Sequence, residues 1–132
     1  CVACDACGMS RSCCQKDDME TVRREILAAD MVVFVTPLYY FGMSAQLKTV
    51  IDRFYSFNGQ LSAKGMKAAL IAAAWDSNDW TMEALKFHYE TLCRYLNFQD
   101  MGTILGTGCG TVSMTEESEF PRKAYAFGRS LS

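Results

Sequence analysis

Residues 31–55 read MVVFVTPLYYFGMSAQLKTVIDRFY, and this stretch decides the fold. It begins with apolar residues that do not alternate with polar ones, which is typical of a strand covered on both faces. Pro37 ends that strand, and Ser44 stands where it can cap a helix whose apolar residues recur at helical spacing. The stretch therefore predicts a buried strand, an aromatic turn and an amphipathic helix, in that order.

Strands and helices alternate along the rest of the chain. The predicted strands are residues 31–36, 67–74 and 101–106. The predicted helices begin at Asp17 or Asp18, at Ser44, after Asp79 and at Ser118, and the second gives way to a loop marked by Gly59 and Lys64-Gly65. Strands that alternate with helices form right-handed crossovers, so we expect an α/β fold with a parallel sheet and helices on both faces. Residues 1–132 are expected to form one domain, with a cysteine-rich loop at 1–16 followed by the order αβαβαβα.

Charge and hydropathy narrow the class of ligand. The 132 residues carry 13 Lys+Arg and 15 Asp+Glu, a formal charge of -2, without any basic run. This balance argues against nucleic acid or an anionic membrane as a partner. The apolar runs are too short to span a bilayer, and the start does not resemble a secretion signal. We therefore expect a cytoplasmic protein that binds a small molecule.

The turn after the first strand is the first candidate site. In open parallel sheets, ligands bind at the carboxyl ends of the strands. Three aromatic residues, Tyr39, Tyr40 and Phe41, lie there beside Gly42. A flat aromatic ligand would fit among them, with free backbone N–H groups donating to its polar edge. The alternative is that these rings fill a core or a contact between subunits.

The turn and the helix after it also carry a family resemblance. Residues 36–53 resemble the signature TP-x-Y-[WF]-x-x-[MP]-[ST]-[AG]-x-[LM]-K-x-[FVL]-[IL]-D-R of the NADPH-dependent FMN reductase group of flavodoxin-like proteins. Cys4-Asp-Ala-Cys7 and Cys14-Gln-Lys-Asp-Asp-Met19 resemble the lead-in of the same group, which includes the iron–sulfur flavoproteins. Tyr125-Ala-Phe-Gly-Arg-Ser-Leu131 is similar to its closing helix.

The resemblance implies a flavodoxin-like three-layer sandwich that binds FMN and passes electrons from NAD(P)H to a small-molecule or protein acceptor. It also implies a homodimer in which the aromatic turn is shared between the flavin and the partner subunit. The residues it assigns to the cofactor are Thr36, Pro37, Leu38, Tyr39, Tyr40, Phe41 and Gly42 in the turn, and Trp75, Asp76 and Asn78 in the loop after the second strand. The family usually has small residues in that second loop, so Trp75 is a departure, and packing is its alternative role. Hydride transfer to a flavin needs no protein nucleophile, and no catalytic side chain is predicted.

The chain as given lacks the part of the family pattern that would precede Cys1. Family members begin with a strand, a Ser/Thr-rich phosphate-binding loop, a helix and a second strand, and this N-terminal βαβ part is absent from the chain as given. We expect the sequence to be a piece of a longer protein, because a sheet without its central strand would expose unpaired apolar edges. The alternative is a structural or regulatory module that has lost the cofactor.

Five of the seven cysteines lie in the first fourteen residues, which in a reducing compartment favours a metal, iron–sulfur or redox site over structural bridges. The spacing of Cys1, Cys4, Cys7 and Cys13 resembles the motif that holds a [4Fe–4S] cluster in iron–sulfur flavoproteins, with Cys14 as an alternative fourth ligand. Zinc binding by these cysteines and free thiols are the alternatives. With a cluster, the alternative function is an electron carrier fed by ferredoxin.

Overall fold

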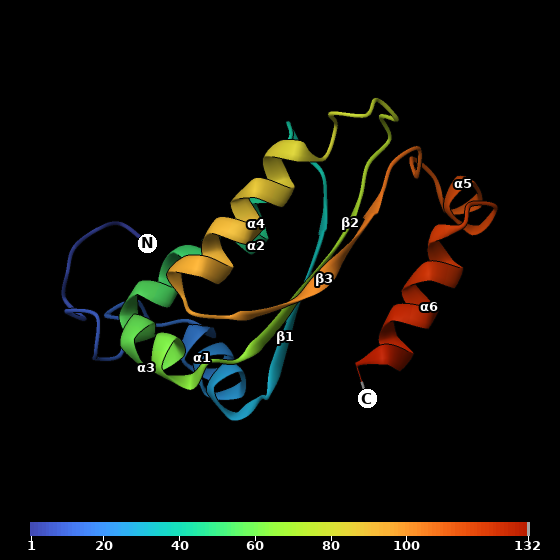
Figure 1. Cartoon of the computed structure of the whole chain (residues 1–132). Coiled ribbons are helices and arrows are strands. Elements are labelled where there is room, and N and C mark those ends of the chain that lie inside the picture. Colours follow the sequence, from blue (N-terminus) through green and yellow to red (C-terminus); the bar gives the residue numbers. More distant parts are fainter. Residues whose placement is uncertain (132) are drawn as a thin grey trace.

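The computed structural model describes residues 1–131 and shows an α/β arrangement (Figure 1). A loop over residues 1–18 leads into the first helix. The elements in chain order are α1 (Met19–Ala28), β1 (Met31–Pro37), α2 (Ala45–Asp52), the 3-10 helix η1 (Arg53–Phe57), α3 (Asn58–Lys64), β2 (Lys67–Ala73), α4 (Glu83–Tyr95), β3 (Gln99–Gly106), α5 (Val112–Glu116) and α6 (Phe120–Ser130). All three predicted strands are confirmed, and β3 begins two residues before its predicted start.

The three strands form one parallel sheet in the order β1-β2-β3. Phe34 of β1 pairs with Leu70 of β2, and Leu70 pairs with Thr103 of β3. Because the strands are parallel, the loops that follow them all leave from the same edge of the sheet. β1 pairs directly with β2, so the three strands are continuous. Unpaired edges lie at the outer sides of β1 and β3, where no other strand pairs among residues 1–131.

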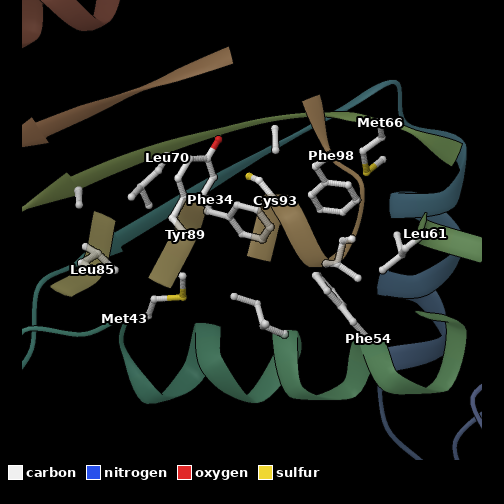
Figure 2. Packing of buried hydrophobic residues seen from close by; sticks show 14 of the residues in the cluster. Phe34, Met43, Phe54, Leu61, Met66, Leu70, Leu85, Tyr89, Cys93 and Phe98 are labelled. Atoms are coloured by element: carbon white, nitrogen blue, oxygen red, sulfur yellow. The ribbon is translucent and has the colours of Figure 1, made fainter. Parts of the chain in front are cut away.

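The main core lies between the sheet and the helices α1 to α4. Phe34, Leu70 and Tyr89 contribute to it from β1, β2 and α4, and the ring centroids of Phe34 and Tyr89 are 6.2 Å apart. Figure 2 shows these side chains pointing toward one another between the strands and α2. Helix α6 packs against β3 on the opposite face, so helices cover both faces as predicted (Figure 1). No helix among the described residues is long and apolar enough to cross a membrane.

One face of β1 departs from the sequence prediction. Val33 is 42% exposed and Val35 is 65% exposed, whereas Phe34 and Thr36 are buried. The prediction of a strand covered on both faces is therefore wrong for β1 in this structure. The physical reason is that α6 packs on β3, which leaves Val33 and Val35 of β1 exposed on that side.

The helical segment after Ser44 also differs from its prediction. Ser44 caps α2 as expected, since its side chain accepts a hydrogen bond from the backbone N–H of Leu47. Gly59, however, lies inside α3 and not in a loop. The chain leaves the helix only at Gly65, whose φ of 58° gives the left-handed conformation that ends many helices. The short helix α5 was not predicted, because it spans only five residues and has no buried side chain.

Candidate functional site

The turn after β1 is fixed by backbone hydrogen bonds. The N–H of Leu38 donates to the carbonyl of Ala73 over 2.8 Å, which holds the start of the turn against β2. Tyr39 and Gly42 exchange two backbone hydrogen bonds of 3.1 Å and close a tight hairpin. At its base the buried Thr36 hydroxyl donates to the Pro37 carbonyl and accepts from the N–H of Ser44. The turn is therefore tied to both β1 and α2.

The two central residues of this hairpin have unusual backbone angles. Tyr40 has a φ of 46° and Phe41 a φ of 64°, the left-handed region that glycine or asparagine normally supplies in such turns. Tyr40 is fully exposed, and no hydrogen bond within residues 1–131 engages the backbone N–H of either residue. Strained backbone of this kind is concentrated at binding and active sites. The turn thus presents aromatic rings together with two free backbone donors.

The loop after β2 is organised by Asp76. The side chains of Thr81 and Asn78 donate hydrogen bonds to its carboxylate, and these bonds lower the pKa of Asp76. The backbone carbonyl of Asp76 also accepts from the N–H of Gly108, in the loop after β3. The side chains of Asp76 and Asn78 therefore stabilise the loop after β2. A backbone hydrogen bond joins this loop to the loop after β3.

Two tryptophans connect these loops into one surface. Trp75 is 70% exposed, yet its ring lies so close to Gly110 that a Cβ on that glycine would come within 2.2 Å of it. Trp80 reaches the other way, with its ring centroid 5.2 Å from that of Phe41. The structure thus gathers the predicted turn and Trp75 at one edge, and it adds Trp80 and Gly110. The glycine-rich run around Gly110 reads as a turn in the sequence, and only the fold shows that Trp75 lies on it.

An apolar cavity of about 320 Å³ opens beside this edge. It lies between the sheet and the helices α5 and α6, and it includes the inner side of Thr36 and Pro37. Val35 and Ile71 line it from the sheet, and Phe120 lines it from α6. No local pattern in the sequence indicates this cavity, because its two sides are far apart in the chain.

The cysteine-rich loop lies elsewhere. Figure 1 shows the amino-terminal loop, in blue, beside α1 and α3, whereas the loops after β1 and β2 are at the top of the view. In this loop Cys4 and Cys14 are in contact, with their sulfur atoms 3.6 Å apart. Cys7 is buried and Cys1 is exposed. Within the described part of the chain, no three His, Cys, Asp or Glu side chains are grouped to hold a metal ion. The four predicted ligands are therefore not brought together here.

Arg53, the first residue of η1, is buried and pairs with this loop. Arg53 is only 6% exposed and pairs with Asp17 through its Nη1 atom. The guanidinium holds the pKa of Asp17 below its ordinary value. The backbone N–H of Gln15 lowers the pKa of the Cys13 thiol, and Arg53 lowers it further. Arg53 thus favours a thiolate at Cys13, a role that its place in the D-R motif alone did not reveal.

Most of the sequence is similar to a known protein family. The sequence matches the family described as NADPH-dependent FMN reductase over residues 2–107. An iron-sulfur flavoprotein of Archaeoglobus fulgidus is 35% identical over 65 residues, which are 49% of this chain and 30% of that protein. A Bacillus subtilis protein described as an NAD(P)H-dependent FMN-containing oxidoreductase is 31% identical over 102 residues, 70% of this chain and 55% of that protein. The chain therefore spans at most about half the length of these two relatives.

Solved structures show the same fold. The Trp repressor binding protein of Bacillus subtilis has a TM-score of 0.70 and 27% identity, covering 83% of this chain and 70% of that chain. General stress protein 14 of Treponema denticola, solved in complex with FMN, also has a TM-score of 0.70. It is 19% identical, with 89% of this chain and 75% of that chain covered, so it speaks for the fold alone.

Proposed function

The chain belongs to the NADPH-dependent FMN reductase family, and we propose that it supplies the ring-binding side of an FMN-dependent oxidoreductase that takes electrons from NAD(P)H and passes them to a small-molecule or protein acceptor. The observation that carries this proposal is the hairpin at the carboxyl end of β1. Its central residues, Tyr40 and Phe41, combine positive φ angles, exposed rings and backbone N–H groups without a partner in the described chain.

The residues present fit the flat part of FMN. The free N–H groups of Tyr40 and Phe41 can donate to the polar edge of a heterocycle, and neighbouring rings can cover its faces. FMN supplies the redox chemistry when bound, accepting a hydride and passing electrons on singly or in pairs. The chain's own part is to hold the ring between the loops after β1 and β2, and to exclude water from it.

Each loop residue has a distinct task in this proposal. Pro37 and the Leu38 hydrogen bond fix where the turn leaves the sheet. Asp76, with Asn78 and Thr81 on its carboxylate, keeps the second loop in shape. Trp80 lies against Phe41 of the turn, and Trp75 lies against Gly110 in the loop after β3. We assign both rings to the acceptor side of the flavin. The exposed Tyr40 suits a contact with a second copy of the chain, and we propose a homodimer on that ground.

A second candidate function is an electron carrier that holds FMN and a [4Fe–4S] cluster and receives electrons from ferredoxin. The relatives named iron-sulfur flavoproteins favour it, as does the spacing of Cys1, Cys4, Cys7 and Cys13. Among the described residues, however, no three of these thiols are grouped to hold a metal ion. We therefore derive no step through a cluster.

The test uses protein expressed from its complete reading frame and purified without oxygen. We expect flavin absorbance bands, release of FMN on denaturation, and oxidation of NAD(P)H without added ferredoxin. Iron and acid-labile sulfide are assayed on the same sample. Turnover only with ferredoxin, together with stoichiometric iron, would establish the carrier. Protein that stays colourless after incubation with FMN would overturn both candidates and support a cofactor-free module.

A paired variant tests the hairpin itself. Replacing Phe41 by Ala removes a ring from the turn, and we expect FMN to bind more weakly in fluorescence titrations. Phe87→Ala is the matched control, because Phe87 is an exposed ring on the outer surface of α4, in a different element. Equal FMN affinity in the two variants would contradict the assignment of the turn to the cofactor.

A further inference from the structure

Cys4 and Cys14 are in contact in the amino-terminal loop. Their sulfur atoms are 3.6 Å apart, although ten residues separate them in the sequence, and both side chains are exposed. A disulfide has an S–S length of about 2.05 Å, so the two atoms need to approach by only about 1.5 Å to bond. An oxidant in solution can reach both of them.

The loop holds the two cysteines in place from both ends. Next to Cys4, the carboxylate of Asp5 accepts a hydrogen bond of 2.8 Å from the hydroxyl of Tyr55. Beyond Cys14, Asp17 pairs with the buried Arg53. Both anchors belong to η1, so the two ends of the loop are fastened to the same short segment. The contact between the thiols therefore follows from how the loop is attached.

The other cysteines of the loop are placed differently. Cys7 is buried, and Cys13 lies under the electrostatic influence of Arg53. Cys14 is only the alternative fourth ligand in the spacing that resembles a cluster motif, and yet it is the residue that contacts Cys4. The fold therefore brings Cys4 and Cys14 together, a pair that the cysteine spacing alone does not predict.

We propose that Cys4 and Cys14 form a redox-active dithiol that hydrogen peroxide converts to a disulfide. The Cys4 thiolate attacks one peroxide oxygen, the O–O bond breaks, and hydroxide leaves, which gives a sulfenic acid on Cys4. The Cys14 sulfur then displaces that hydroxyl group, which leaves as water with the thiol proton. The hydroxide takes up the proton that the Cys4 thiol released on forming its thiolate. The two sulfur atoms together thus lose two electrons, and the peroxide is reduced to two molecules of water.

This site excludes a metal bound through Cys4 in the same molecule, since a sulfur in a disulfide is not a thiolate ligand. It is independent of flavin binding, because the loop lies away from the turn after β1 (Figure 1). Failure of the proposed flavin function would therefore leave this proposal standing, and the reverse holds as well.

The experiment uses the complete protein, purified with oxygen excluded and treated with equimolar hydrogen peroxide. Free thiols are then blocked with N-ethylmaleimide before digestion with trypsin. Cleavage after Arg11 and Lys16 places Cys4 and Cys14 in separate peptides. We expect mass spectrometry to find the peptide ending at Arg11 linked to the peptide of residues 12–16, and reduction to release them.

Variants identify which sulfurs are joined. The linked peptide should disappear in Cys4→Ser and Cys14→Ser, and persist in the matched controls Cys7→Ser and Cys13→Ser. In Cys14→Ser the sulfenic acid on Cys4 has no partner, so we expect it to accumulate and to react with dimedone. This adduct is a positive signal that an unfolded variant would not give selectively at Cys4.

Three results would overturn the proposal. The first is that Cys4 and Cys14 of the native protein are both still free after peroxide treatment and both react with N-ethylmaleimide. The second is a link that survives in Cys14→Ser, which would show that another cysteine is the partner. The third is iron or zinc in the anaerobic protein that is lost in Cys4→Ser, which would make Cys4 a metal ligand.

Discussion

The rings of Phe41 and Trp80 lie 5.2 Å apart between their centroids and join the turn after β1 to the loop after β2. The two residues are distant in the sequence, and each belongs to a loop that leaves the same edge of the sheet. Neither ring is buried, since Trp80 is 53% exposed and Phe41 is 42% exposed. The contact therefore orders a surface and does not fill a core.

Removing this contact should weaken both the fold and the binding of FMN. In Trp80→Ala we expect the free energy of unfolding to fall by about 1 kcal/mol, the size of one aromatic pair. Without the contact, FMN binding has to order the two loops itself. A cost of about 1 kcal/mol weakens the Kd by about fivefold, so we expect FMN affinity to drop by that factor. Fluorescence titration of the complete protein measures it. Trp80→Phe, which keeps a ring, should restore most of the affinity, and failure to do so would argue against ring contact as the cause.

Gly110 is expected to control the position of Trp75. A Cβ at residue 110 would lie 2.2 Å from the Trp75 ring, so Gly110→Ala forces the indole to move. We expect a changed tryptophan emission spectrum and altered FMN binding in this variant. Gly59→Ala is the control, because nothing lies within 4 Å of a Cβ there and the residue is helical. That control should gain about 0.5–1 kcal/mol of stability and leave the emission unchanged.

The strained hairpin predicts an unusual response at Tyr40. Its φ of 46° costs a residue with a Cβ about 1 kcal/mol, and its fully exposed side chain loses little packing on removal. Tyr40→Gly should therefore raise the free energy of unfolding by about that amount, as measured by urea denaturation. Tyr40→Val should lower it, because β-branched residues tolerate this region worst. Equal stabilities of the two variants would show that the turn relaxes freely.

The Asp17–Arg53 pair predicts how stability depends on pH. The folded protein holds the pKa of Asp17 below its unfolded value, which is about 3.9. The stabilisation is therefore fully present above about pH 4 and is lost as pH falls through the lower, folded pKa. We expect the native protein to exceed Asp17→Asn in stability at neutral pH, and the difference to shrink below about pH 4. Parallel urea titrations of both proteins measure this. A difference that is constant down to about pH 2 would contradict the ion pair as its source.

Local signals in the sequence predicted most of the architecture. Ser44 was identified as a helix cap, and it does accept the hydrogen bond from Leu47. The β2 strand was expected to be buried, and its middle residues are. These features depend on neighbours in the chain, which is why periodicity and capping rules reach them. The prediction of a loop at Gly59 is wrong for the same reason. Glycine is a local signal for a helix break, and here Gly59 lies inside α3.

The site was predictable only in part. The sequence placed Tyr39 to Gly42 at the carboxyl end of β1, where the structure has them. It could not show that Tyr40 and Phe41 adopt positive φ, because both are residues that normally avoid it. The contacts of Trp75 with Gly110 and of Cys4 with Cys14 join segments that only tertiary structure brings together. The spacing of residues along the sequence does not predict such pairs.

The outer side of β1 has a practical consequence for anyone who expresses residues 1–132 by themselves. Its hydrogen-bonding groups are unpaired in the described structure, and Val33 and Val35 add a bare apolar strip beside them. Such an edge is a template onto which another strand can add. We expect this segment alone to form precipitates or mixed oligomers at high concentration. The Val35→Lys substitution should keep the segment in solution, which light scattering would show.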